Sequence, residues 1–349
     1  MREIFFNGVR VADDTDAYVI AEIGHNHQGN VETAKSLFKS AKECGAHAVK
    51  LQKRNNRTLF TKALYDSPYT GENSYGDTYG AHREALELGE SEYRELQAYA
   101  KELGLTMFAT AFDFESADFL ERLDMPIYKI ASGDLTNTPL LKHIAAFGKP
   151  MILSTGGGTM DDIQKACDTV MSINPQLCIL QCTACYPVED YADMNLRVIS
   201  TLRRSFPTNV IGLSDHESGI SMALVAYTLG ARVIEKHFTL NRSWRGTDHA
   251  FSLAPVGLRR LVRDLKRARK AMGDGVKRRL PREEKPLFKM RKKIVAARDL
   301  PAGHVLTRND VALKSPGDGL PPFELDRVLG RTLKVRVSTD QNITFENLE

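Results

Sequence analysis

The stretch Val210-Ile-Gly-Leu-Ser-Asp-His216, together with Val233-Ile-Glu-Lys-His-Phe238, decides how this chain is expected to fold. Gly212, Ser214 and His216 share one parity in the first stretch, as Glu235 and His237 do in the second, and the apolar residues Ile211, Leu213, Ile234 and Phe238 take the other parity. Because side chains alternate faces along a strand, each stretch is predicted to be a strand that projects its polar groups to one side. Two imidazoles that converge at strand ends are suitable ligands for a divalent metal ion.

Strand-like runs of this kind alternate with helix-length segments along the chain. Eight β-then-α units over roughly 270 residues match the size of a (β/α)8 TIM barrel. A doubly wound sheet is the competing fold, but it usually has fewer repeats and an early Gly-x-Gly-x-x-Gly turn, and the triplet Gly156–Gly158 follows only the fifth strand. The expected strands are Tyr18–Gly24, Ala48–Lys53, Thr106–Phe112, Ile127–Gly133, Met151–Gly156, Cys178–Thr183, Val210–His216 and Val233–Thr239.

The pattern changes after the eighth helical segment. We expect a barrel domain over residues 1–272, a linker over 273–292, and a small domain of short strands and turns over 293–349. So small a domain has a thin core and is expected to lean on something larger. The expected last barrel helix, about Val256–Met272, has an apolar face and a basic face, which we interpret as solvated because aromatic residues for base stacking are missing.

Composition excludes several classes of protein. The chain has 349 residues, 42% of them hydrophobic and 26% charged, and its net charge of +4 does not imply a nucleic-acid partner. No run of apolar residues is long enough to span a membrane, and the first residues, Met1–Gly8, lack the apolar stretch expected of a secretory signal. Five cysteines, an odd number, indicate reduced thiols and a cytoplasmic location. Cys178, Cys182 and Cys185 lie along a strand and its exit without a second pair, which argues against a structural zinc site.

Polar side chains stand at the carboxyl ends of the expected strands, where barrel enzymes carry their active sites. Two lysines, Lys50 and Lys129, together with several hydroxyl groups make a receptor for a phosphate or carboxylate group. The alternative is a structural network in which the lysines pair with Glu22 and Asp134. The expected rim consists of Glu22, Lys50, Gln52, Lys129, Ser132, Asp134, Ser154, Thr183, Tyr186, Ser214, His216, Glu235, His237 and Asp248.

Motifs at these strand ends resemble the sialic acid synthase family. The resemblance runs nearly end to end, because the C-terminal part resembles that family's antifreeze-like (SAF) domain. Three further stretches are similar to the animal branch of the family: Pro68–Arg83, Asn195–Ser200 and Trp244–His249. The motifs are Ala21-Glu-Ile-Gly-His-Asn-His-Gln-Gly29, Lys50-Leu-Gln-Lys53, Tyr128-Lys-Ile-Ala-Ser-Gly-Asp134, Ile152-Leu-Ser-Thr-Gly156, Gln181-Cys-Thr-Ala-Cys-Tyr-Pro187, Gly212-Leu-Ser-Asp-His216 and Glu235-Lys-His-Phe-Thr239.

The resemblance implies condensation of phosphoenolpyruvate with N-acetylmannosamine or a related aldose, giving a nine-carbon 2-keto acid such as N-acetylneuraminate, and phosphate. It implies a divalent ion, Mn2+ or Mg2+, on His216 and His237, and a proton-handling role for Glu22. The phosphoenolpyruvate site would comprise Lys50, Lys129, Ser132, Ser154 and Ser214. The sugar site would comprise Gln52, Asp134, Tyr186, Glu235 and Asp248.

The chain departs from the pattern of many bacterial members at two positions. Ala184 stands where they have asparagine, and Ser315 stands where their SAF loop carries an arginine that reaches the partner's sugar, with Lys314 beside it. Both changes concern the sugar more than phosphoenolpyruvate. The resemblance also implies a homodimer in which each SAF domain covers the other subunit's barrel.

Other functions stay open at this point. A metal-dependent amidohydrolase would use His25-x-His27, but that class also wants histidines at strand ends where Ser154 and Thr183 stand, so we expect His25 and His27 to be loop residues near the site. A non-enzymatic carbohydrate- or ice-binding protein would leave the polar rim unexplained. Within the family, the sugar is free N-acetylmannosamine, its 6-phosphate, or a diacetamido sugar on the way to legionaminic or pseudaminic acid.

Overall fold

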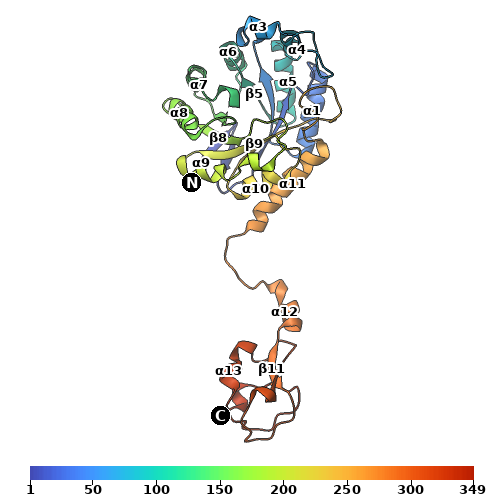
Figure 1. The fold of residues 1–349 in the computed structure, drawn as a ribbon, viewed down its shortest axis with the longest axis vertical. Helices are drawn as coiled ribbons and strands as arrows, with labels where there is room; N and C mark the ends of the chain where they lie inside the picture. The colour runs from blue at the N-terminus through green and yellow to red at the C-terminus, as the bar shows by residue number, and fades with distance from the viewer. The chain divides into compact units, whose positions relative to one another are not determined.

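The structure of the protein is a computed structural model that describes residues 1–349. The chain divides into two compact units, Met1–Gly273 and Asp274–Glu349 (Figure 1). The expected linker over 273–292 holds a short helix, α12 (Glu284–Met290), that begins inside the second unit. None of the helices combines the length and the apolar character needed to cross a bilayer.

The first unit is a closed barrel of parallel strands, which confirms the predicted (β/α)8 fold. Neighbouring strands follow chain order around the barrel, and β10 closes it by pairing with β3. The largest difference from the predicted bounds concerns the fourth strand, which ends at Ile130 and turns into a 3-10 helix over Ser132–Asp134. The strands are β3 (Tyr18–Gly24), β4 (Ala48–Lys53), β5 (Thr106–Ala111), β6 (Tyr128–Ile130), β7 (Met151–Ser154), β8 (Leu177–Cys182), β9 (Val210–Asp215) and β10 (Val233–His237).

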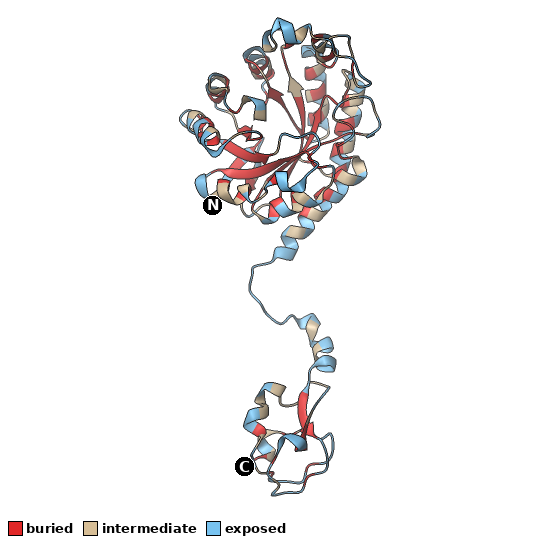
Figure 2. Cartoon of the chain, viewed as in Figure 1, coloured by how far each residue is buried: buried red, intermediate tan, exposed pale blue.

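Helices surround the barrel and carry one buried face each, seen as alternating red and pale bands (Figure 2). Local sequence sets their ends: the side chain of Asn30 caps the first helix, which stops at Gly45 with a left-handed backbone. The connection between β4 and α5 is long and holds three short helices, α2 (Asn56–Leu59), α3 (Lys62–Tyr65) and α4 (Tyr79–Glu84). The main helices are α1 (Val31–Cys44), α5 (Glu90–Glu102), α6 (Phe114–Arg122), α7 (Thr138–Ala145), α8 (Met160–Met171), α9 (Val198–Ser205), α10 (Ser221–Thr228) and α11 (Pro255–Met272).

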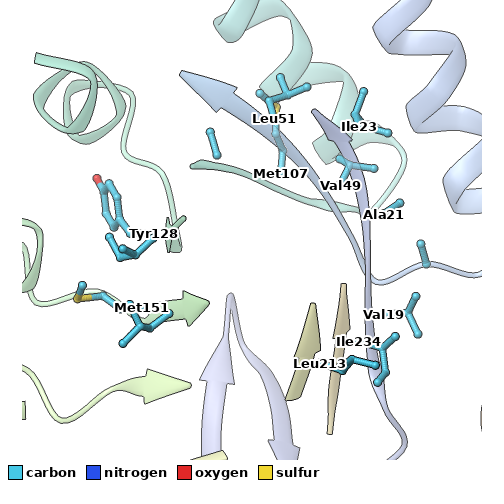
Figure 3. Close-up of a cluster of buried hydrophobic side chains, with 14 of the residues drawn as sticks. Val19, Ala21, Ile23, Val49, Leu51, Met107, Tyr128, Met151, Leu213 and Ile234 are labelled. Atoms are coloured by element: carbon cyan, nitrogen blue, oxygen red, sulfur yellow. The ribbon is translucent and has the colours of Figure 1, made fainter. Parts of the chain in front are cut away.

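Alternation along the strands separates two apolar cores. One parity, which includes Val19, Leu213 and Ile234, packs between the strands and the helices (Figure 3). The other parity faces the barrel interior, where Ile20 and Val233 belong to a second buried cluster. The inward-facing side chains are thus mainly apolar near the starts of the strands and mainly polar near their carboxyl ends. The half of the barrel at the strand starts is therefore a hydrophobic core, and the half at the carboxyl ends, called the upper barrel below, carries the polar side chains.

A hairpin that the sequence analysis did not predict belongs to the interior core. Strands β1 (Glu3–Phe6) and β2 (Val9–Ala12) pair antiparallel around Asn7-Gly8, and both turn residues have positive φ. Ile4, Phe6 and Val11 join the interior cluster of the barrel. The hairpin therefore contributes apolar side chains to the end of the barrel opposite the polar strand ends.

The second unit is a small fold of short strands and turns, as predicted. Its strands β11 (Lys293–Ala296) and β12 (Val311–Lys314) pair antiparallel, and a short helix, α13 (Leu325–Val328), follows. The expected strand over 333–337 forms only isolated bridges, because Val335 faces solvent between the buried Leu333 and Val337. The core consists of Ile294, Ala296, Leu300, Leu306, Val311, Val328, Leu333, Val337, Ile343 and Leu348.

A buried carboxylate, Asp310, organises one loop of this second unit. It accepts hydrogen bonds from the backbone and hydroxyl of Thr307, at 2.8 and 2.6 Å, and lies 3.0 Å from Nε2 of His304 and 2.6 Å from an Nη atom of Arg298. Burial opposes its charge, but these partners outweigh burial and hold the pKa of Asp310 below its usual range. The ionised carboxylate therefore stabilises this unit.

We expect Asp310→Asn to lower the free energy of unfolding of the second unit by about 1–3 kcal/mol, because donors lose a charged acceptor. Since the folded pKa is depressed, the stabilisation is present above pH of about 4 and is lost as the pH falls further in the wild-type protein. Hydrogen exchange of the β11 amides at pH 7 and near pH 3.5 measures both effects. Asp318→Asn, which removes an exposed partner of Lys293, is the control and should change exchange little.

Candidate active site

The upper barrel contains a cavity of about 400 Å³ at the carboxyl ends of the strands. Every residue of the predicted phosphoenolpyruvate site lines it, as do Glu22 and the two histidines. Of the predicted sugar-site residues, Gln52, Tyr186, Glu235 and Asp248 line the cavity and Asp134 does not. The strand ends thus bring together side chains that lie more than two hundred residues apart in the sequence.

Two lysines and two glutamates form a buried charge network at the floor of the cavity. Nζ of Lys50 lies 2.7 Å from a carboxylate oxygen of Glu22 and donates to Thr110 at 2.8 Å. One oxygen of Glu235 lies 3.7 Å from Nζ of Lys50 and 3.6 Å from Nζ of Lys129. The predicted structural pairing of Lys50 with Glu22 is therefore present, and the partner of Lys129 is Glu235 rather than Asp134.

Burial shifts the proton affinities of this network in different directions. Desolvation raises the pKa of Glu22 despite the attraction of Lys50, and it lowers the pKa of Lys129 despite Glu235. Glu235 is also desolvated, but the two lysines outweigh burial and lower its pKa. Glu22 is thus the carboxylate that takes up a proton more readily, whereas Glu235 stays ionised between the cations.

Hydroxyl groups complete the cation-rich floor. Nζ of Lys129 donates to the Ser154 hydroxyl at 2.6 Å. The Ser214 hydroxyl donates to Glu235 at 3.3 Å, and the Ser132 hydroxyl accepts from the backbone N–H of Gly156 at 3.0 Å. These groups are positioned by their strands and by the turn after β6, and they face the same volume as the lysines. The arrangement suits an anion with several acceptor oxygens.

The two histidines lie side by side on β10 and directly after β9, with ring centroids 5.4 Å apart. Nδ1 of His216 lies 2.8 Å from the Thr183 carbonyl oxygen, so this nitrogen carries the proton and Nε2 is free. Burial lowers the pKa of His216 to about 4 and also lowers that of His237, so both rings are neutral at pH 7. Nδ1 of His237 is buried without a hydrogen-bond partner, 3.6 Å from Asp248.

Neutral imidazoles with free lone pairs fit a divalent metal ion. No group of three or more His, Cys, Asp or Glu side chains gathers in metal-binding geometry. Two imidazoles from the protein therefore leave the remaining coordination positions to water or substrate oxygens. This donor set suits an open, catalytic type of site better than a closed, structural one.

The predicted sugar residues surround the histidines, with one exception. The ring of Tyr186 packs against that of His216, tilted by 40° with the centroids 4.1 Å apart, and Ala184 also lines the cavity. Asp134 instead accepts a hydrogen bond from Asn137 at 3.1 Å, because β6 ends early and the 3-10 turn carries this carboxylate away from the cavity. The expected strand over Ile127–Gly133 would have brought Asp134 to the rim with Lys129 and Ser132, but β6 is shorter than that.

Sequence reasoning missed several residues that line the cavity. Arg54, two residues beyond Gln52, continues the inward parity of β4, and this signal was available in the sequence. Arg83 comes from α4 in the long connection, and no local pattern indicates that it reaches the site. His25 lines the cavity as expected of a loop residue near the site, whereas His27 does not. The remaining missed lining residues are Thr110, Phe112, Ala131, Gly133, Cys182 and Thr247.

Family models and known proteins match this chain over most of its length. Residues 37–277 match the model of the NeuB family, and residues 291–349 match the SAF domain. The chain is 40% identical over 330 residues to N-acetylneuraminate-9-phosphate synthase of Homo sapiens, covering 94% of this chain and 92% of that protein. It is 36% identical over 350 residues to N,N'-diacetyllegionaminic acid synthase of Legionella pneumophila, covering 98% of both.

A solved structure is also similar to this chain in its architecture. The N-acetylneuraminic acid synthetase of Leptospira borgpetersenii, solved in complex with citrate, is 30% identical, with a TM-score of 0.71 over 82% of this chain and 95% of that one. The family match covers most of the chain, and the resemblance seen in the motifs is confirmed. The chain therefore belongs to the NeuB family of synthases and carries a SAF domain at its C-terminal side.

Proposed function

We propose that this enzyme condenses phosphoenolpyruvate with an N-acetylmannosamine-type aldose and water, giving a nine-carbon 2-keto acid of the sialic acid class and inorganic phosphate. The observation that carries the proposal is the single cavity in which two buried lysines, a carboxylate of raised pKa and two neutral imidazoles face one another. A binding protein has no use for so costly a set of buried charges.

Phosphoenolpyruvate carries a carboxylate and a phosphate, and the floor of the cavity offers cations and hydroxyls for both. Lys50 and Lys129 supply the charge, and Ser132, Ser154 and Ser214 supply further hydrogen bonds. In the free enzyme Glu22 and Glu235 neutralise the lysines. The arriving anion takes over the lysines as partners, which favours proton uptake by the carboxylate of higher pKa, Glu22.

Glu22 is the proposed proton-handling group for the water that adds at C2 of the enol. Its carboxylate is held from two sides, by Lys50 at 2.7 Å and by the Gln52 amide at 2.7 Å, so it is fixed in position. Burial keeps its proton affinity nearer to neutral pH than that of an exposed carboxylate. Holding both substrates in one cavity contributes further by orientation, an effect of up to about 7–11 kcal/mol.

The sugar is proposed to lie against Gln52, Tyr186, Glu235 and Asp248, with its aldehyde toward the histidines. His216 and His237 would hold the divalent ion, Mn2+ or Mg2+, and when bound this ion polarises the aldehyde oxygen. His216 is oriented by its contact with the Thr183 carbonyl oxygen, and the tilted ring of Tyr186 packs against it. Asp134 is not carried into this proposed sugar site.

We also propose a homodimer in the cytoplasm, in which the SAF domain covers the partner's cavity. The small core of the second unit and the absence of any disulfide among the five cysteines support these two assignments. Within the second unit, Lys314 pairs with Asp340 and the Ser315 hydroxyl accepts from Lys292 at 2.7 Å. Light scattering after size-exclusion chromatography measures the dimer.

Phosphate release from phosphoenolpyruvate with Mn2+ tests the reaction, with N-acetylmannosamine and its 6-phosphate as parallel substrates. We expect turnover with at least one sugar, and a loss of about tenfold or more in His216→Ala, because the proposed Lewis acid loses one of two protein ligands. Titration of Mn2+ into wild type and variant provides a second measurement that does not depend on turnover. If no phosphate were released with these sugars or with 2,4-diacetamido aldoses, the synthase proposal would be contradicted and a carbohydrate-binding role would be favoured.

A further inference from the structure

We propose that Arg54 and Arg83 form a second anion-binding subsite in the active-site cavity, and that it takes a phosphate monoester at the far end of the aldose. This inference rests on the proposed function and names its substrate class, a 6-phosphorylated amino sugar. Both guanidinium groups line the cavity, and neither belongs to the lysine–glutamate network at its floor.

Neither arginine has a carboxylate partner within 4.0 Å. Arg54 donates to the Gln52 side-chain oxygen at 2.7 Å and stacks on Phe112, with its central carbon 3.7 Å from the ring centroid. Arg83 donates to the Tyr79 hydroxyl at 3.0 Å. The nearby carboxylate of Glu87 is engaged instead by Nζ of Lys53 at 2.8 Å.

An arginine as buried as Arg54, which is 9% exposed, normally has an anionic partner. Burial first, and then the neighbouring charge of Arg83, lower the pKa of Arg54 to about 10, and the more distant Glu87 and Asp248 do not compensate. The free protein therefore holds two like charges close together in a low-dielectric cavity. Such an arrangement is relieved when an anion enters.

The contacts of His25 show that the two guanidinium groups lack hydrogen-bond acceptors as well as a negatively charged partner. An Nη atom of Arg54 lies 2.9 Å from its Nε2, and an Nη atom of Arg83 lies 3.2 Å from its Nδ1. Burial and the two arginines lower the pKa of His25 well below its usual value, so the ring is neutral and has one acceptor nitrogen only. Whichever tautomer is present, one guanidinium faces a ring N–H and has a donor to spare.

The subsite lies at a distance from the lysine pair that suits the length of an open-chain sugar. Lys50, Gln52 and Arg54 have the same parity along β4 and its exit, and four residues of extended chain span about 13 Å. Gln52 lies between the two ends: its amide donates to Glu22 at 2.7 Å and its oxygen accepts from Arg54. An aldose whose C1 lies toward the histidines, where it meets phosphoenolpyruvate bound at the floor, can therefore direct its C6 substituent toward Arg54.

A phosphate monoester suits these two guanidinium groups better than a neutral hydroxyl does. Its three oxygens can accept from both planar guanidinium groups, and its charge neutralises them. A free C6 hydroxyl would leave both charges uncompensated beside the bound sugar. The structure thus assigns a preference for the phosphorylated aldose to two residues that the motifs of the strand ends do not include.

The experiment compares N-acetylmannosamine 6-phosphate with N-acetylmannosamine in wild type, Arg54→Lys, Arg83→Gln and Arg57→Gln. We expect wild type to prefer the 6-phosphate at least tenfold in kcat/KM, and Arg83→Gln to lose about 10- to 100-fold for the 6-phosphate, with the free sugar changed by less than about threefold. Arg54→Lys keeps the charge and should lose less. Arg57 stacks on Tyr65 at the surface and lies outside the cavity, so Arg57→Gln should match wild type.

Two outcomes would overturn the subsite: equal kcat/KM for both sugars in wild type, or an equal loss for both sugars in Arg83→Gln. Calorimetric titration of the 6-phosphate separates this failure from failure of the proposed reaction, because binding needs no turnover. If no aldose releases phosphate from phosphoenolpyruvate but the 6-phosphate binds wild type and not Arg83→Gln, the subsite stands without the reaction. If it binds both proteins equally, the subsite is contradicted whatever the reaction does.

Discussion

Glu22→Gln is expected to lower kcat for phosphate release from phosphoenolpyruvate about 10²–10⁴-fold, the range that a positioned acid or base contributes. Glutamine keeps the shape of the side chain and its contact with Gln52, but it cannot accept and return a proton. Because the proposed phosphoenolpyruvate contacts come from other residues, KM for phosphoenolpyruvate should stay within about threefold. Steady-state kinetics with a phosphate-release assay gives both constants.

The same change removes one partner of a buried ion pair, and this effect must be separated from catalysis. Loss of one partner of a buried pair costs about 3–5 kcal/mol of unfolding free energy when nothing replaces it. Lys50 keeps Thr110 and the more distant Glu235, so the expected loss in Glu22→Gln is smaller. Its thermal unfolding should show a lower midpoint that phosphoenolpyruvate raises again by supplying negative charge.

Asp215→Asn is the matched control for the loss of one partner of a buried ion pair. Asp215 is equally buried, and its carboxylate lies 2.8 Å from Nζ of Lys236, but it stands on the opposite parity of β9 and does not line the cavity. We expect a comparable loss of stability with kcat close to that of wild type. If Asp215→Asn lost as much kcat as Glu22→Gln at equal stability, the effect of Glu22 would be structural and its proton-handling role would be contradicted.

The alternation that predicted the barrel also predicted most of the cavity. Ser214 and His216 face the barrel interior because they have the same parity along β9 as Val210 and Gly212. Glu235 and His237 have the same parity as Val233 on β10 and face inward for the same reason. The prediction needed only the period of a strand and the rule that barrel sites lie at the carboxyl ends. The fourth strand is shorter than predicted: β6 is three residues long, and Asp134 lies in the 3-10 turn that follows it.

Two omissions have different physical causes. The N-terminal hairpin was predictable, because Asn7-Gly8 between alternating residues is a strong hairpin signal, and both residues adopt the positive φ that this turn requires. Arg83 was not predictable, since it reaches the cavity from a helix in the long connection after β4. Tertiary placement of a connection is decided by packing rather than by its own periodicity.

Lys129→Met is expected to raise KM for phosphoenolpyruvate about 30- to 5,000-fold, which corresponds to the roughly 2–5 kcal/mol that truncation of a buried, hydrogen-bonded charge costs in binding. Methionine fills the space of the aliphatic stem but removes the charge and the hydrogen bond to Ser154. The KM for the sugar should change less than the KM for phosphoenolpyruvate, because the ion pair between Lys129 and the proposed sugar site runs only through Glu235, at 3.6 Å. Initial rates with each substrate varied in turn measure the two constants separately.

The choice of methionine also limits the structural damage. Lys129 is desolvated at 3% exposure, and burial lowers its pKa although Glu235 opposes that shift, so the free protein gains little from holding this cation. Glu235 retains Lys50 at 3.7 Å and the Ser214 hydroxyl. The unfolding midpoint of the free variant is therefore expected to fall less than that of Glu22→Gln, and phosphoenolpyruvate should raise it less than in wild type.

Lys53→Met distinguishes a specific anion site from a general effect of lysine removal. Lys53 ends β4 on the opposite parity, where its Nζ donates to Glu87 at 2.8 Å and to the Leu88 carbonyl at 3.0 Å, outside the cavity. Its loss should leave KM for phosphoenolpyruvate at the wild-type value. If Lys129→Met raised KM for the sugar and not for phosphoenolpyruvate, the lysine would face the aldose, and the floor of the cavity would have to be assigned to the sugar.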